Sequence, residues 1–547
     1  MVDLPGSVEP APGGDSPPPS EAEVEVCLRV LAQARKADPD DPRWSAVHQA
    51  VAQVHRATKK ARKSSRHAER RRHDREILAT ATRFHDQDPA PPSPGLGRPS
   101  ADGGLAAPAV APGGGVLPSV TTAPPARHTP AMQNDTAPQK AGITRNDAVT
   151  QDDTAAPNGA AVQSRSVTRD GSEVRRGGAL VGARRCYVCK GRYQRVHPEY
   201  HLLCPGCAEE NLAHRYARCD LRGRRALVTG GRIKIGFQVA LKLLRDGAEV
   251  LVTTRFPHDA ARRFAAVPDH ADWLERLHVY GVDFLDVPAL AELPGFVERR
   301  FGHLDILVNN AAQTIRRPPA YHREVRAGED GPLEGTAALV DVHGTGHWAL
   351  PEGTPGGALP VRAAGDAVEA LFPAGRTDET GQPLDLRERN SWNLRLHEVD
   401  PGEWLEVQVV NAFAPFLLTS RLRGALESSP FPDRYVVQVS AMEGSFSRVN
   451  KTVRHPHTNM AKASLNMLTR TVAADYAASG IHMNSVDTGW VTDERPHPDK
   501  LAQRAAGFRP PLDVVDGAAR VYHPVVRGVR GERMSGLFLK DYRPVEW

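Results

Sequence analysis

Three things are scarce in this sequence: cysteine, long apolar runs and an excess of either charge. Six cysteines occur among 547 residues, and no apolar run is long enough to cross a bilayer. The 70 basic and 65 acidic residues leave a net charge of +5, so binding to nucleic acid or membranes would need a local basic patch. Residues 1–6 lack a basic region followed by an apolar stretch, so we expect no secretory signal. We therefore expect a cytoplasmic protein without membrane contact, whose thiols are reduced or bound to metal.

Proline and glycine are plentiful but unevenly spread, and they divide the chain. Residues 1–20 are rich in Pro, Gly and Ser, and we expect them to be disordered. Residues 86–178 are mainly Pro, Ala, Gly, Thr and Ser with almost no aromatic side chains. Such a segment cannot bury enough apolar surface to offset its chain entropy, so we interpret it as a disordered linker. The hydrophobic content of 40% indicates that the remaining chain can form a core.

Residues 21–85 show the periodicity of two helices. The apolar positions of the first recur at helical spacing: Val24, Cys27, Leu28, Val30 and Leu31. The second carries basic runs at residues 59–63 and 70–72, which could bind nucleic acid or an acidic partner. Interspersed acids (Glu69, Asp74 and Glu76) and the lack of interleaved aromatics favour a solvated helix face instead. We predict a helical hairpin whose second helix extends into solvent.

Four cysteines form two Cys-x-x-Cys pairs within residues 179–219. They are Cys186, Cys189, Cys204 and Cys207. This spacing is typical of a four-thiolate Zn²⁺ site and resembles a zinc ribbon, although an iron–sulfur site and free thiol pairs are the alternatives. We expect this module to pack against the domain that follows, and we expect Cys27 and Cys219 to be ordinary buried thiols.

A strand, a glycine turn, a helix and a second strand follow one another from residue 224 to residue 252. The apolar run at residues 226–228 predicts a buried strand, and Ile235, Val239, Leu243 and Leu244 recur at helical period after the turn. The N-terminus of such a helix presents free N–H groups to a phosphate. The order of elements predicts an α/β fold, a Rossmann-type doubly wound parallel sheet.

Several ordered motifs in residues 221–547 resemble the short-chain dehydrogenase/reductase family. The glycine motif is matched at Thr229, Gly230 and Gly236, with Lys234 in place of the middle glycine, and residues 305–312 resemble the strand that ends in Asn-Asn-Ala. The resemblance implies an NAD(P)-dependent oxidoreductase acting on a carbonyl or alcohol. The cofactor contacts that we expect are Thr229, Gly230, Gly231, Arg232, Lys234, Ile235, Gly236, Arg255, Asp283, Asn310, Ala311, Lys462, Gly489 and Thr492.

The end of the second strand predicts which dinucleotide is bound. Folds that bind NAD(H) place an acid there for the ribose 2′-hydroxyl, whereas a basic side chain suits the 2′-phosphate of NADP(H). Here Thr253 and Thr254 are followed by Arg255, and Arg232 lies in the glycine turn. We therefore predict a preference for NADP(H). The alternative is that both arginines merely face solvent.

About a hundred residues separate Ala312 from Asn411, where the family needs a few tens. The excess, residues 327–387, is rich in Gly, Pro and acidic residues. We interpret it as an insertion beside the cleft, either a lid that shapes the substrate site or an excursion without a role there.

The expected catalytic set departs from the family pattern. Asn411 and Lys462 match the family, but Thr458 stands where the Tyr of Tyr-x-x-x-Lys is expected, and Ser440 lies beside the usual Ser position, which is Ala441. A Thr hydroxyl titrates far above the pKa of about 10 of Tyr, so Thr458 is no substitute acid. His457, His455 and Lys451 are therefore candidates for proton transfer, unless they are ordinary loop residues.

Two functional hypotheses follow. In the first, the protein is an NADP(H)-dependent oxidoreductase with a rearranged proton-transfer set, and the retained Asn411 and Lys462 favour it. In the second, it is a catalytically inactive nucleotide sensor or scaffold, and the missing Tyr favours that. Besides the partners of the basic helix, we consider a small-molecule substrate and further copies of the same chain in a homo-oligomer.

Overall fold

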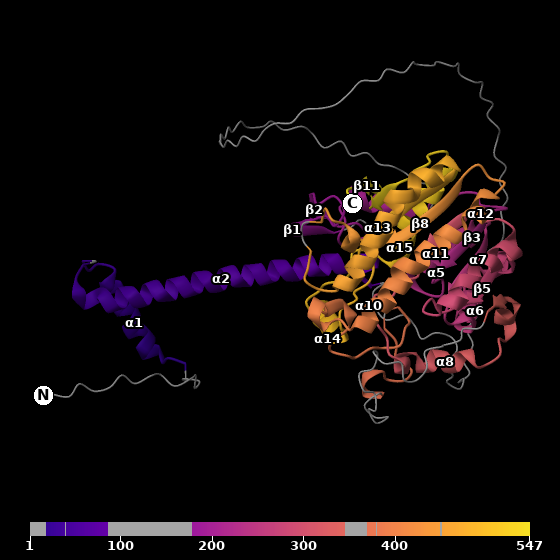
Figure 1. Cartoon of the computed structure of the whole chain (residues 1–547). Coiled ribbons are helices and arrows are strands. Elements are labelled where there is room, and N and C mark those ends of the chain that lie inside the picture. The colour runs from indigo at the N-terminus through magenta and orange to yellow at the C-terminus, as the bar shows by residue number, and fades with distance from the viewer. Residues whose placement is uncertain (1–17, 39, 86–177, 345–368, 379, 449–450) are drawn as a thin grey trace, which may run out of the picture. The chain divides into compact units, whose positions relative to one another are not determined.

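The computed structural model describes residues 18–38, 40–85, 178–344, 369–378, 380–448 and 451–547 (Figure 1). Most of the N-terminal segment expected to be disordered, nearly all of the expected linker and the middle of the expected insertion lie outside these residues. Within the described ranges, every helix is too short or too polar to span a bilayer.

A nine-stranded sheet forms the centre of the C-terminal region. Its order is β11-β10-β9-β8-β6-β3-β4-β5-β7, and all neighbours are parallel except β10 and β11. The strands are β3 (Arg225–Thr229), β4 (Glu249–Thr254), β5 (Leu277–Gly281), β6 (Ile306–Asn309), β7 (Asp341–His343), β8 (Arg434–Ser440), β9 (Ile481–Asp487), β10 (Leu537–Lys540) and β11 (Arg543–Val545). The continuous apolar runs of β3, β4 and β6 suit strands that are covered on both faces. The predicted doubly wound Rossmann-type sheet is confirmed.

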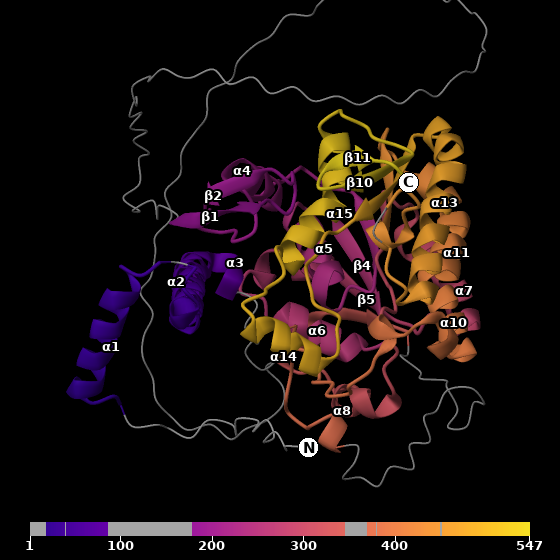
Figure 2. The ribbon, with the colours of Figure 1, turned by 90° about the vertical axis from the view of Figure 1, so that its left-hand side faces the viewer.

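Helices cover both faces of this sheet (Figure 2). Alternate strand residues point to opposite faces, so Val228 packs in one apolar core while Leu227 packs in the other. The first core lies under α5 (Lys234–Arg245), α6 (Pro257–Ala265) and α15 (Val514–Val529). The second lies under α7 (Val287–Phe301), α11 (Ala414–Arg421), α12 (Arg423–Glu427) and α13 (Pro456–Ala478).

Part of the expected insertion extends the sheet. Its strand β7 pairs in parallel with β5, with Val342 opposite Val279. The other helices near the carboxyl ends of the strands are α8 (Arg323–Glu329), α10 (Pro401–Gln408), the π-helix η8 (Val409–Phe413) and α14 (His497–Ala505). These segments surround the edge of the sheet where ligands bind in such folds.

The N-terminal region contains two long helices. They are α1 (Glu21–Ala34), which Ser20 caps through a capping box with Glu23, and α2 (Ser45–Ala79). The short α3 (Thr82–His85) follows. Cys27 is exposed on α1, so the expectation that this thiol is buried is wrong, because its helix face contacts too little of the chain to cover it. Cys219 is half-buried, with its Sγ 3.1 Å from Tyr522 Oη.

The cysteine module is a two-stranded ribbon followed by a helix. It consists of β1 (Ala179–Arg185), β2 (Arg192–Arg195) and α4 (Pro205–Arg215). Its buried residues form one apolar core with the end of α2 and with Val491 and Leu512 of the sheet domain. Buried polar contacts reinforce this packing, since Tyr200 Oη donates to Asp516 Oδ1 at 2.7 Å and Arg215 lies 2.7 Å from Asp513. The module is thus built into the surface of the sheet domain.

Candidate functional site

The glycine turn between β3 and α5 packs closely against the residues that follow β6. Gly230 has a φ of +67°, and a Cβ there would lie 2.9 Å from the Cα of Ala311. A Cβ on Gly236 would lie 2.3 Å from Gly230 O. Within the described residues, the N-cap Ile233 offers no side-chain cap to α5, which leaves first-turn N–H groups for an anion. The turn therefore fits the pyrophosphate of a dinucleotide.

The predicted residues at the ends of β3 and β6 hold this turn in place. Thr229 Oγ1 accepts hydrogen bonds from the N–H groups of Asn310 and Ala311, both at 2.9 Å. The side-chain amide of Asn310 donates to Thr229 O at 2.9 Å and to Gly230 O at 3.1 Å. Through these hydrogen bonds Asn310 holds the backbone of the turn in position, a role that the Asn-Asn-Ala string alone does not reveal.

Two arginines flank Phe256 where β4 ends. The guanidinium carbons of Arg232 and Arg255 lie 5.0 Å and 5.7 Å from the centre of its ring. Arg232 also pairs with Asp259 at 2.6 Å, and its side chain is 12% exposed. Burial lowers the pKa of Arg255, which Asp283 partly offsets. The structure thus brings Arg232, Arg255 and Asp283 together, with two positive charges beside the glycine turn.

Lys234 occupies a backbone conformation that favours glycine. Its φ is +52°, and its ammonium lies 3.2 Å from Glu494 Oε1. Thr492 Oγ1 donates to the same carboxylate oxygen at 2.8 Å. Burial alone would raise the pKa of Glu494, but Lys234 and further positive charge bring it to about 2. A carboxylate is therefore fixed at the N-terminus of α5, and no sequence motif marks Glu494 for this position.

Asn411 holds the chain that leaves β6. It lies in the π-helix η8, its Oδ1 accepts from Gln313 N at 2.6 Å, and its Nδ2 donates to Gln313 O at 3.0 Å. Single π turns within longer helices often occur at functional sites. Asn411 therefore fixes the backbone of Gln313 in the chain that follows β6.

Thr458 and Lys462 share one face of α13. Both are buried, and Thr458 Oγ1 has no hydrogen-bond partner among the described residues. The Lys462 ammonium donates to Val439 O at 2.8 Å, and burial lowers its pKa to about 8. Ser440 Oγ donates to Asn466 Oδ1 at 2.7 Å and so faces α13.

The candidate proton donors lie apart from this face. His457 is five positions from Lys462, which places it about 140° around the helix, and its Nε2 is 3.4 Å from Glu403 Oε1. His455 stacks on Trp392 with ring centres 4.0 Å apart. The ammonium of Lys451 donates to the carbonyl oxygen of Glu443.

The four cysteines of the ribbon come together as a compact cluster. One Sγ of each lies within 4.8 Å of the others, and the Cys189 and Cys204 sulfurs are 3.7 Å apart. Tetrahedral Zn–S bonds of about 2.3 Å require S–S separations of roughly 3.8 Å. The N–H of Cys204 also donates to Cys186 Sγ at 3.3 Å, a contact that favours the thiolate. The donor set and spacing fit Zn²⁺.

A second group of metal-ligating residues lies at the edge of the sheet and escaped the sequence analysis. His278, Asp341 and His343 meet where β5 pairs with β7. Arg300 lies 3.5 Å from Asp341 Oδ2 and supplies a positive charge without a metal. The group is therefore a polar network that fastens β7 to the sheet.

Comparison with known proteins agrees with this architecture. A family profile described as "short chain dehydrogenase" matches residues 224–326, and one described as "Enoyl-(Acyl carrier protein) reductase" matches residues 389–506. An uncharacterized protein of Acanthamoeba polyphaga mimivirus is 35% identical over 353 residues, covering 62% of this chain and 71% of the viral protein. Carbonyl reductase [NADPH] 1 of Sus scrofa is 38% identical over 104 residues, covering 18% of this chain and 34% of its own.

The solved structures to which this chain is similar include a short-chain dehydrogenase from Burkholderia cenocepacia in complex with NADP. It is 21% identical, covers 59% of this chain and 98% of its own, and has a TM-score of 0.39. The viral relative, the family profiles and the ordered motifs of the nucleotide fold lead to one assignment. The chain belongs to the short-chain dehydrogenase/reductase family.

Proposed function

We propose that this protein is an NADP(H)-dependent oxidoreductase that transfers hydride to or from a carbonyl- or alcohol-type substrate. The observation that carries the proposal is the pair Arg232 and Arg255, which places two positive charges beside the glycine turn at the end of β4. These charges suit the 2′-phosphate that distinguishes NADP(H) from NAD(H).

The strand end itself supports the same preference. The hydroxyl of Thr253 accepts from Gly230 N at 3.3 Å, and that of Thr254 accepts from Phe256 N at 3.0 Å. Both side chains therefore shape the turn, and neither is an acid that would hold a ribose 2′-hydroxyl. The similarity to a carbonyl reductase whose name specifies NADPH points the same way.

The bound dinucleotide would supply the hydride, and the chain must supply the proton. Lys462, with its pKa lowered to about 8, can release a proton near neutral pH. Thr458 lies one helical turn from it. Its hydroxyl has no hydrogen-bond partner in the part of the chain that the structure describes, and it can relay a proton by hydrogen bonding without ionising. His457 is the second candidate, because its neighbour Glu403 is placed to orient and stabilise a charged imidazole.

We further propose that Cys186, Cys189, Cys204 and Cys207 hold one Zn²⁺ per chain. Their compact arrangement and the N–H donated to Cys186 Sγ support this assignment over two free thiol pairs. The ion would stabilise the ribbon and would take no part in hydride transfer.

The second candidate function is a nucleotide sensor without turnover. The replacement of the family Tyr by Thr458 favours it, because a Thr hydroxyl does not titrate near neutral pH. In that case the same nucleotide preference would hold, but no substrate would be reduced.

Equilibrium titration with NADPH and NADH tests the proposal. We expect NADPH to bind about tenfold or more tightly than NADH, and Arg255→Ala to remove most of this difference. Equal affinities in the wild type would contradict the proposal. Assays of NADPH oxidation with a set of carbonyl substrates then distinguish the two candidate functions. An enzyme oxidises NADPH with one of the substrates, whereas a sensor binds NADPH without oxidising it.

A further inference from the structure

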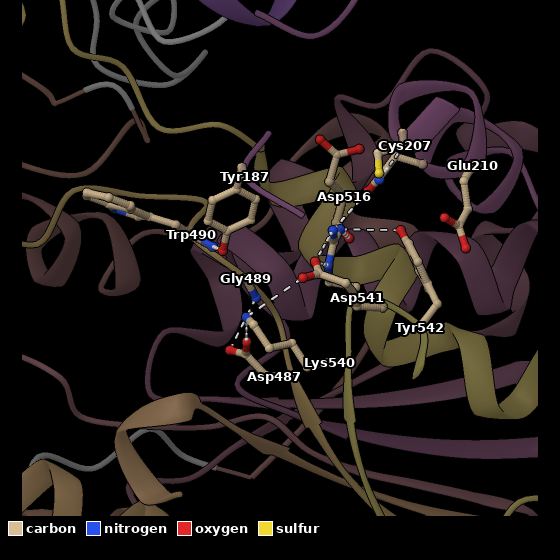
Figure 3. Close-up of polar contacts among 12 residues, drawn as sticks. Tyr187, Cys207, Glu210, Asp487, Gly489, Trp490, Asp516, Lys540, Asp541 and Tyr542 are labelled. Atoms are coloured by element: carbon tan, nitrogen blue, oxygen red, sulfur yellow. Dashed lines mark hydrogen bonds and ion pairs between the residues drawn. The ribbon is translucent and has the colours of Figure 1, made fainter. Parts of the chain in front are cut away.

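The cysteine ribbon contacts the segment that follows β9, here called the β9 loop (residues 488–495). The N–H of Trp490 donates to Tyr187 Oη at 2.9 Å (Figure 3). Tyr187 directly follows Cys186, and its own N–H donates to Leu202 O at 2.9 Å. One side chain thus connects the four-thiolate cluster to the backbone of the loop.

Apolar packing fixes the same part of the loop. Val491 belongs to the ribbon core, which also contains Cys186 and Leu203. A Cβ on Gly517 would lie 3.1 Å from Ile235 Cδ1 and 3.2 Å from Val491 Cγ1, so the loop, α5 and α15 meet closely there. The base of the β9 loop is therefore enclosed between the ribbon and the start of α5.

The far end of the β9 loop contacts the glycine turn directly. Glu494 pairs with Lys234 at 3.2 Å, and its carbonyl oxygen accepts from Asn390 Nδ2 at 3.1 Å. A displacement of the base at Trp490 would therefore move the two predicted cofactor contacts of the loop, Gly489 and Thr492, away from the phosphate-binding end of α5.

Buried charged residues hold the ribbon on the sheet domain. Arg520, which is 1% exposed, donates to Asn211 Oδ1 of α4 and to Asp541 Oδ1, both at 2.8 Å. Figure 3 shows Asp541 near the pair of Lys540 and Asp487 at the end of β9. Such buried, charge-assisted contacts resist displacement more than exposed ones do.

We propose that the ribbon sets the affinity of the protein for its dinucleotide, with Tyr187 as a positioning residue that holds the β9 loop. The inference rests on the proposed function, because it assigns the loop to the NADP(H) site. This proposal gives the four-thiolate cluster a role in cofactor binding. Loss of the metal would lower the affinity for NADPH even though the glycine turn itself is unchanged.

The test uses the full chain with Tyr187→Phe, which removes the hydroxyl and keeps the ring. The matched control is Tyr193→Phe, whose hydroxyl donates to His201 O at 2.9 Å within the ribbon and does not contact the loop. NADPH affinity is measured by titration, zinc content by metal analysis, and loop order by hydrogen exchange of the Trp490 amide without nucleotide. We expect Tyr187→Phe to weaken NADPH binding about five- to tenfold and to speed Trp490 exchange, with unchanged zinc content.

The control should stay within about twofold of the wild type on both readouts. If Tyr187→Phe leaves NADPH affinity and Trp490 exchange unchanged, the inference is overturned while the proposed function stands. If both variants weaken NADPH binding equally, the ribbon acts only through stability and Tyr187 is no positioning residue. A wild type that binds neither dinucleotide overturns the proposed function, and the inference with it.

Discussion

At the scale of single residues, the Lys234–Glu494 pair lies at the helix N-terminus where the proposed function places a phosphate. The carboxylate and a dinucleotide phosphate are both anions, and both suit the same ammonium and the same helix N-terminus. Nucleotide binding must therefore displace Glu494 from Lys234 or share the lysine with it. This competition makes the pair a determinant of affinity.

Glu494→Gln should tighten NADPH binding about three- to tenfold, because the amide is a weaker competitor for Lys234. The control is Asp499→Asn, which changes an exposed acid on α14 and should leave the affinity unchanged. Titration of the wild type and both variants at one ionic strength measures the effect. Weaker binding by Glu494→Gln would show that the pair belongs to the nucleotide-bound arrangement.

The burial of Lys462 predicts a pH dependence of turnover. Burial lowers the pKa of its ammonium to about 8, and a proton donor must be protonated before it can act. The rate of carbonyl reduction should therefore be highest below that pH and should fall as the pH rises through it. Lys462→Gln should lose about a hundredfold or more in kcat. His457→Ala separates the two candidate donors, since a greater loss of kcat in that variant than in Lys462→Gln would assign the proton to the histidine instead.

At the scale of elements, the ribbon should depend on its metal. Cys204→Ser should abolish stoichiometric zinc binding and lower the melting temperature, because a structural zinc site contributes directly to folding free energy. Cys27→Ser, which changes an exposed thiol on α1, should alter neither property. Metal analysis together with thermal denaturation gives the result, and iron in place of zinc would contradict the assignment.

Elements with a local signal could be predicted from the sequence, and those with a long-range cause could not. The strand and turn from Ala226 to Gly236 carry their pattern in adjacent residues, and so do the Cys-x-x-Cys pairs. By contrast, β7 forms only because it pairs with β5, and its three residues have no period to detect. Glu494 likewise has a role only because folding brings it to Lys234, 260 positions earlier.

The proposed catalytic residues Thr458 and Lys462 have one property that the sequence predicts and one that depends on the whole fold. The spacing of Thr458 and Lys462 placed both on one helix face, as the four-residue interval requires. The lowered pKa of Lys462 depends on how deeply the fold buries it, which no local pattern contains.

At the scale of the whole molecule, buried charges join the ribbon to the sheet domain. Arg215 lies 3.0 Å from Asp516, which is fully buried, and it also contacts Asp513. Arg215→Met would leave two buried carboxylates without this partner, so we expect a loss of about 3–5 kcal/mol in the free energy of unfolding. Arg222→Met removes the exposed pair with Asp220 and should cost at most about 1 kcal/mol. Chemical denaturation of both variants compares them, and equal losses would refute a special role for the buried pair.

The contact between Tyr200 and Asp516 joins residues 316 positions apart. This separation sets the delay between the synthesis of the ribbon and the synthesis of the residues on which it packs. Synthesis proceeds at about 5–20 residues per second, so the ribbon leaves the ribosome roughly 15–60 seconds before its docking partner does. During that interval its four thiols and its half of the shared core stand exposed. Early capture of a zinc ion would protect them, so zinc supply during translation, as much as the final fold, should decide the yield of folded protein.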